Sequence, residues 1–129
     1  MATRPYPTPA EMAAALAHKL AEAEHIDYVT PCPIDWSPRP SHCHDNAEEW
    51  VRLHPTWSVV CGWLHVSGNV ESGAIFDAHS VVRDASGRLW DVTQQTFHSF
   101  IRYDGPEAQF LAAVSDRSWV QITYLPATT

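Results

Sequence analysis

The chain has 129 residues, of which 45% are hydrophobic and 18% charged, so length and composition predict one folded domain and exclude a disordered or fibrous protein. Its formal net charge is -7 and its Lys and Arg residues form no cluster, which argues against nucleic acid as a partner. No apolar run reaches the ~20 residues of a transmembrane helix, so we expect no membrane partner.

The N-terminal segment and the cysteines predict a cytoplasmic protein. His18 and Lys19 interrupt the Ala-rich run near the N-terminus, so a secretory signal is not expected. Cys32, Cys43 and Cys61 are odd in number and irregularly spaced, which is typical of free thiols in a reducing compartment. We expect the domain to fold alone or as a homodimer.

The first predicted element is a helix that follows a loose arm over residues 1–7. Thr8 and Glu11 have the spacing of a capping box, and Pro9 occupies the first helical position, where proline is well tolerated. Apolar residues recur every four positions after this start, which predicts a helix with one buried stripe that ends near Glu24.

A second helix is expected after a proline-rich stretch. The prolines of residues 30–40 exclude regular structure and predict a stiff, ordered loop. Ser41 is a favourable N-cap, and a helix from about His42 to Leu53 should follow it. Cys43 would then lie in the first turn of this helix.

The second half of the chain predicts an antiparallel sheet. Segments rich in β-branched and aromatic residues alternate with Gly and Ser, and Ala85, Ser86 and Gly87 predict a hairpin turn. We expect an α+β fold in which the N-terminal helices pack on one face of the sheet. The expected strands cover residues 57–66, 74–82, 88–92, 97–103 and 118–125, with a short helix over 104–114.

Cys43, His79 and Asp91 are the candidates for catalysis. The unpaired N–H groups at a helix start stabilise a thiolate, a neighbouring His can act as base, and a carboxylate can orient that His. If the hairpin loop has three residues, 85–87, then His79 lies opposite Thr93 and diagonal to Asp91 on the same face. A four-residue loop would place Asp91 on the other face.

This order of residues resembles the papain-like cysteine hydrolases, especially their transglutaminase-like branch. Over residues 41–93, Cys43-His44-Asp45-Asn46 is similar to the nucleophile helix, and His79 to Thr93 is similar to the strand with His, glycine turn and Asp followed by Thr. The resemblance implies a papain/transglutaminase-like core, Cys43 as nucleophile, His79 as base and Asp91 as orienting carboxylate. It implies no cofactor.

A hydrolase or acyl transferase of this kind works through a thioester. Because the chain is short, we expect a small-molecule or peptide amide or ester as substrate. Trp36 could wall the pocket or pin the loop. We expect the N–H of Cys43 to be one oxyanion donor and the proline-rich loop to supply a second, near Trp36 or Ser41. His44 flanks the nucleophile, and Asn46 either binds substrate or bonds across to the sheet.

Two other functions are consistent with the same residues. A Zn or non-haem Fe enzyme could use Cys and His ligands, although adjacent helical residues point about 100° apart and cannot all reach one ion. The ligands would come from His42, Cys43, His44 and His79 with Asp91 or Asp77. A non-catalytic binding protein would instead use the aromatic residues and the proline-rich loop, and Cys61 is expected to be a buried core residue.

Overall fold

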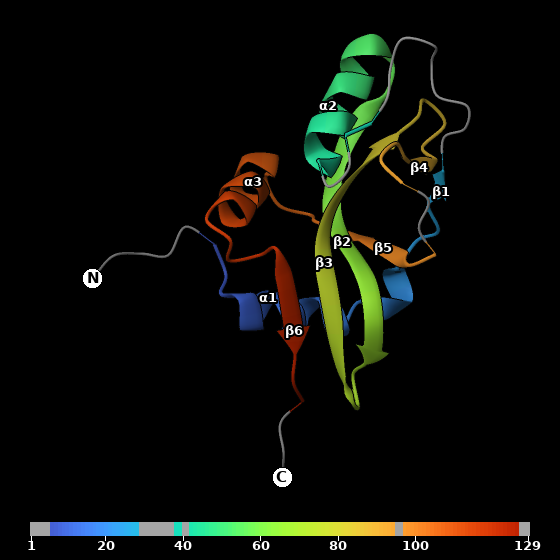
Figure 1. Ribbon diagram of the computed structural model, residues 1–129. Helices are drawn as coiled ribbons and strands as arrows, with labels where there is room; N and C mark the ends of the chain where they lie inside the picture. The colour runs from blue at the N-terminus through green and yellow to red at the C-terminus, as the bar shows by residue number, and fades with distance from the viewer. Residues whose placement is uncertain (1–5, 29–37, 40–41, 95–96, 127–129) are drawn as a thin grey trace.

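The computed structural model describes residues 6–28, 38–39, 42–94 and 97–126. Within these ranges it is an α+β protein with three α-helices and a six-stranded, mostly antiparallel sheet (Figure 1), as the sequence predicts. The helices are α1 (Pro9–Ala17), α2 (Cys43–Leu53) and α3 (Glu107–Ser115). The strands are β1 (Asp27–Tyr28), β2 (Ser58–Asn69), β3 (Gly73–Arg83), β4 (Leu89–Asp91), β5 (Ser99–Arg102) and β6 (Gln121–Tyr124). None of the described helices has the length and apolar character needed to cross a membrane.

Strand β3 has two different neighbours along one of its edges. The sheet order is β1-β4-β3-β2-β5, and β6 pairs with β3 outside this path. Since β2 covers one edge of β3, strands β4 and β6 must share the other, at residues 82–83 and 74–77 respectively. The N–H of Ala78 donates to the carbonyl of Val120 over 3.0 Å. Residues 79–81 are therefore left between β4 and β6, without a strand partner on that edge in the described chain.

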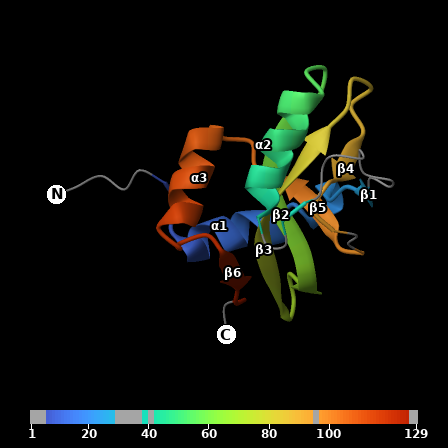
Figure 2. The ribbon, with the colours of Figure 1, turned by 45° about the horizontal axis from the view of Figure 1, so that its top comes forward.

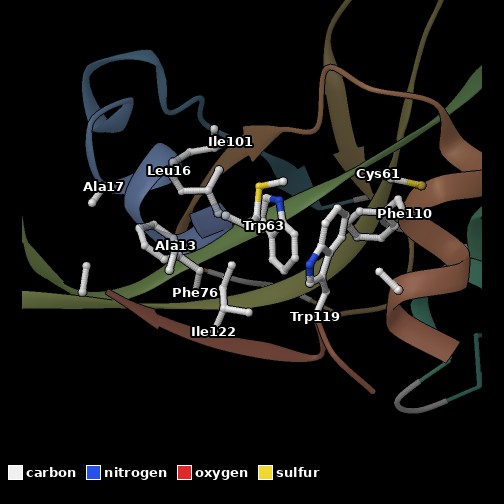
Figure 3. Close-up of a cluster of buried hydrophobic side chains, with 13 residues drawn as sticks. Ala13, Leu16, Ala17, Cys61, Trp63, Phe76, Ile101, Phe110, Trp119 and Ile122 are labelled. Atoms are coloured by element: carbon white, nitrogen blue, oxygen red, sulfur yellow. The ribbon is translucent and has the colours of Figure 1, made fainter. Parts of the chain in front are cut away.

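The helices cover one face of the sheet. Because side chains alternate along a strand, Trp63 of β2 and Val82 of β3 point to the same side. Leu16 of α1 and Phe110 of α3 pack in one cluster with Trp63 (Figure 3), while Trp50 of α2 packs with Val82. Figure 2 shows α1 and α3 next to β3 and β6. The expected placement of helices on one face is confirmed.

The predicted extent of the first helix is wrong, although its start is confirmed. Thr8 and Glu11 form the expected capping box, but α1 ends at Ala17 and only a short 3-10 turn, Leu20–Glu22, follows. The backbone of Glu24 exchanges two hydrogen bonds with Phe100, of 2.7 and 2.9 Å. The backbone must already be in an extended conformation at Glu24 to make this bridge, so the helix cannot continue that far.

The β3–β4 hairpin has the three-residue loop that the sequence predicts. The N–H of Asp84 donates to the carbonyl of Arg88 over 3.0 Å, and Val82 pairs with Trp90. Gly87 has a φ of 95°, a backbone conformation that residues other than glycine rarely adopt. The Gly at the third loop position therefore fixes the register on which the site depends.

Candidate active site

His79 and Asp91 form a buried hydrogen bond across the hairpin. The distance from His79 Nε2 to Asp91 Oδ2 is 2.7 Å, and the two residues are 6% and 1% exposed. The other carboxylate oxygen, Oδ1, accepts the backbone N–H groups of Thr93 at 2.8 Å and Gln94 at 3.1 Å. Among the described residues the His79 ring is the one cationic partner of this carboxylate, so Asp91 can fix the orientation of that ring.

Cys43 reaches this pair from the start of helix α2. The helix begins at Cys43, with His42 as its N-cap, and packs on the face of the sheet opposite to His79. Its first residue meets β3 at the unpaired edge, where the backbone N–H of Ser80 and the ring of His79 both hydrogen-bond to the thiol. Because Nε2 of His79 is bonded to Asp91, the ring nitrogen left for Cys43 is Nδ1.

The surroundings of Cys43 and His79 favour the charged form of both groups. Burial works against a thiolate, but the hydrogen bond and charge of His79 and the Ser80 amide outweigh it, so the pKa of Cys43 lies below its usual 9.0. Burial also disfavours an imidazolium, but the hydrogen bonds of Asp91 and Cys43 raise the pKa of His79 to about 9. Both shifts stabilise the same thiolate–imidazolium pair.

A cleft of about 220 Å³ opens beside this pair. Cys43 and His79 form part of its wall, so the predicted nucleophile and base can be reached by a small ligand. Sequence reasoning assigned no substrate contact to the other lining residues. They are Leu64, Asp77, Ala78, Thr93 and Gln94.

The signal for two of these residues was present in the predicted hairpin. Asp77 precedes His79 by two positions and therefore shares its face of β3. Thr93 is the position opposite His79 when the β3–β4 register is continued beyond its two paired positions. Gln94 carries no comparable signal, because it lies beyond the last paired residue of β4.

Asn46 joins the helix to its neighbours and does not line the cleft. It is 4% exposed, and its side-chain N–H groups donate to Arg39 O at 2.9 Å and Thr93 Oγ1 at 3.0 Å. Its Oδ1 accepts the N–H of Arg39 at 2.9 Å. Of the two roles considered for Asn46, the bond across to the sheet is the one observed.

His44 points to the opposite side of β3 from the cleft. Its Nδ1 lies 3.0 Å from Ser80 Oγ, and its Nε2 lies 3.0 Å from Glu48 Oε1. The thiol of Cys61 is 3.8 Å from the same Nδ1. Since successive helical residues are turned by about 100°, His44 cannot share the direction of Cys43, and no substrate contact at the cleft follows from its position.

Among the described residues, the predicted metal ligands form no group of three whose ligand atoms all lie within 4.8 Å of one another. A different group, formed by His44, Cys61 and Glu107, places three ligand atoms within 4.8 Å of one another. Burial raises the pKa of Cys61 to about 11, so its sulfur stays protonated when no metal ion is bound. We interpret this group as a hydrogen-bonded network that joins α2 and α3 to the sheet. Cys61 is buried, as predicted.

Trp36 and Ser41 lie outside the described residues, so their predicted contacts with substrate stay predictions. The N–H of Asn46 is the first to donate within α2, to His42 O at 2.9 Å, so the N–H of Cys43 has no acceptor inside the helix.

Comparison with known proteins adds no family to this geometry. No family model, no curated protein and no solved structure matches the chain.

Proposed function

We propose that the protein is a cysteine-dependent hydrolase or acyl transferase of the papain/transglutaminase-like kind. The observation that supports this most strongly is the continuous series of hydrogen bonds from Cys43 through His79 to Asp91, placed at the wall of a cleft. Nucleophile, base and orienting carboxylate in mutual contact are the recognised requirement for thiol catalysis.

The reaction proceeds in two transfers. The Cys43 thiolate attacks the carbonyl carbon of an amide or ester, and the His79 imidazolium gives its proton to the leaving amine or alcohol. The acyl group is then held as a thioester on Cys43. Neutral His79 takes a proton from water or from an acceptor amine as that molecule attacks the thioester, and Cys43 is released as the thiolate. Asp91 stabilises the imidazolium in both transfers without being protonated.

The oxyanion of each tetrahedral intermediate requires hydrogen-bond donors. The backbone N–H of Cys43 is one donor, since it lies at the positive end of α2 without an intrahelical acceptor. Gln94 lines the same cleft and carries an amide, so we propose it as the second donor. The donors expected near Trp36 or Ser41 lie outside the described residues, so they stay predictions beside Gln94.

The volume of the cleft favours a small acyl group. A site of about 220 Å³ fits one amino-acid side chain or a short acyl chain, below the roughly 300–1,000 Å³ of sites for drug-sized ligands. We therefore propose a small-molecule or peptide substrate, and no general proteolysis. A thiolate nucleophile is protected from oxidation in a reducing compartment, and for this reason we propose a cytoplasmic location.

The test is the pH dependence of Cys43 alkylation by iodoacetamide, followed by peptide mass mapping. In the parent protein we expect alkylation to persist well below the pKa of a free thiol, about 8.5. His79→Ala should shift the alkylation curve to the ordinary thiol range. His44→Ala is the matched control, because it removes a neighbouring His that faces away from the cleft, and it should leave the curve unchanged.

An alkylation curve typical of a free thiol, the same in the parent and in His79→Ala, would contradict the proposal. A non-catalytic binding protein would then be the better interpretation.

A metal-dependent enzyme is the second candidate, favoured by the group of His44, Cys61 and Glu107. It predicts zinc that copurifies or binds at one equivalent and is lost in Cys61→Ala, as measured by elemental analysis.

A further inference from the structure

Asp77 places a carboxylate in the wall of the cleft, close to the proposed nucleophile. It lies on the same face of β3 as His79 and two residues before it, which corresponds to about 7 Å along the strand. Both residues line the cleft together with Cys43. A ligand whose reacting carbonyl lies at Cys43 would therefore reach Asp77 if it extends only a few atoms beyond that carbonyl.

The carboxylate of Asp77 is held in position by a neutral partner. Gln121 of β6 donates its side-chain N–H to Asp77 Oδ1 over 2.7 Å. Among the described residues no Lys, Arg or His side chain forms an ion pair with Asp77, and only one of the eight Lys and Arg residues of the chain, Arg4, lies outside the described ranges. The negative charge of Asp77 is thus positioned but not compensated by the described part of the protein.

No other described residue of the cleft wall offsets this charge. Leu64, Ala78, Thr93 and Gln94 are neutral. The His79 imidazolium lies between two anions, the Cys43 thiolate and the Asp91 carboxylate, so these three groups together add a further negative charge. The potential in the cleft is therefore negative, and Asp77 is the carboxylate of its wall. In a concave, partly desolvated site a single carboxylate of this kind attracts cations and repels anions.

We infer that the substrate of this site carries a positively charged group, an amine or a guanidinium, which Asp77 binds while Cys43 attacks the acyl carbon. In a transfer reaction the same carboxylate would instead receive the protonated amine of the acceptor before it loses its proton to His79. The inference rests on the proposed function and deepens it by giving the chemical class of the substrate.

Charged thiol reagents test this inference without knowledge of the substrate. Aminoethyl methanethiosulfonate carries a cation and sulfonatoethyl methanethiosulfonate an anion. With either one, the Cys43 thiolate attacks the reagent's sulfenyl sulfur, a mixed disulfide forms, and methanesulfinate leaves with the electron pair. The measured quantity is the ratio of the two rate constants at Cys43, located by peptide mapping, because the ratio cancels differences in general thiol reactivity between variants.

The test variant is Asp77→Asn, which removes the charge but keeps an oxygen that can accept the Gln121 hydrogen bond. The matched control is Glu71→Gln, which makes the same change of net charge at an exposed position in the β2–β3 turn. This turn lies beyond Gly73, which is itself about 14 Å along the strand from Asp77. We expect the cation-to-anion ratio to fall about tenfold in Asp77→Asn and to stay within about twofold of the parent in Glu71→Gln.

An unchanged ratio in Asp77→Asn, or an equal fall in both variants, would overturn the inference. If Cys43 alkylation by iodoacetamide still depended on His79 in that case, the proposed function would stand with a substrate of another charge. If Cys43 behaved as an ordinary thiol whatever the residue at position 79, the proposed function itself would fail, and the inference with it. The two failures are therefore distinguishable from the same set of proteins.

Discussion

The side-chain amide of Asn46 donates a hydrogen bond to Thr93 Oγ1 over 3.0 Å, which joins the helix that carries Cys43 to the segment that follows Asp91. The same amide also exchanges two hydrogen bonds with the backbone of Arg39, at 2.9 Å each. Cys43, the first residue of α2, meets β3 at the stretch that pairs with neither β4 nor β6. Asn46 thus sets the distance between the proposed nucleophile and the carboxylate that orients its base.

Replacing Asn46 should therefore weaken both the fold and the site. Asn46→Ala removes three hydrogen bonds from a residue that is 4% exposed, and we expect the free energy of unfolding to fall by about 2–3 kcal/mol. Urea denaturation measures this, and iodoacetamide labelling should show slower alkylation of Cys43 at neutral pH. Thr93→Val removes one of the three bonds and should cost about 1 kcal/mol. Equal stability of parent and Asn46→Ala would contradict the positioning role.

Asp91→Asn should lower the reactivity of Cys43 without removing the fold. An Asn oxygen can still accept the N–H groups of Thr93 and Gln94, but a neutral amide no longer stabilises the His79 imidazolium. The pKa of His79 should then fall, since burial alone lowers it. We expect alkylation of Cys43 at pH 7 to slow by roughly tenfold or more, because one pKa unit corresponds to about 1.4 kcal/mol.

The control for Asp91→Asn is Asp27→Asn, which removes a partly exposed carboxylate bonded to Arg88 near the other end of the hairpin. Its alkylation rate should match that of the parent. Retained fast alkylation in Asp91→Asn, with a thermal unfolding curve like that of the parent, would show that Asp91 does not support the thiolate.

The local part of the site could be predicted from the sequence because its geometry follows from one short loop. The three-residue turn that ends at Gly87 determines the pairing of β3 and β4, and strand alternation then places His79 and Asp91 on one face. The helix start is likewise a local property, although it lies one residue later than predicted, with His42 and not Ser41 as the N-cap. Neither step requires knowledge of distant contacts.

The rest of the site depends on contacts between segments far apart in sequence. The pairing of β6 with the same edge of β3 as β4, which leaves room for Cys43, joins residues more than 40 positions apart. The direction of His44 is set by Ser80 of β3 and Cys61 of β2, on the face of the sheet opposite to the cleft. Such tertiary partners leave no periodic pattern in the sequence, so the roles expected for His44 and Asn46 could not be decided from it.

Cys61 should be far less reactive than Cys43, although a His and a carboxylate stand near it as well. Burial raises the pKa of Cys61 to about 11, so at pH 8 only about 0.1% of its thiol is ionised. We expect iodoacetamide to label Cys43 at least about 100-fold faster than Cys61, as measured by mass mapping of the two peptides. Comparable labelling of both residues would show that the group of His44, Cys61 and Glu107 activates a second thiol.

The raised pKa of His79 should also make the stability of the protein depend on pH. A His whose folded-state pKa lies above its unfolded value stabilises the fold fully below the unfolded pKa and loses that contribution as pH rises through the folded one. For His79 this window runs from 6.5 to about 9, and the contribution within it is roughly 3 kcal/mol at most. Its sign is a loss of stability with rising pH.

Cys43 acts in the opposite sense, because a lowered thiol pKa adds stability as pH rises towards the unfolded value of 9.0. The two effects are separated in a Cys43→Ala background, where urea denaturation at pH 6, 7, 8 and 9 (about one unit apart across the window) is compared with and without His79→Gln. We expect the difference in unfolding free energy between the two proteins to shrink as pH rises. A difference that is constant with pH would mean that the buried ring of His79 stays neutral in the folded protein, and that Asp91 does not hold it as the cation which the proposed mechanism needs.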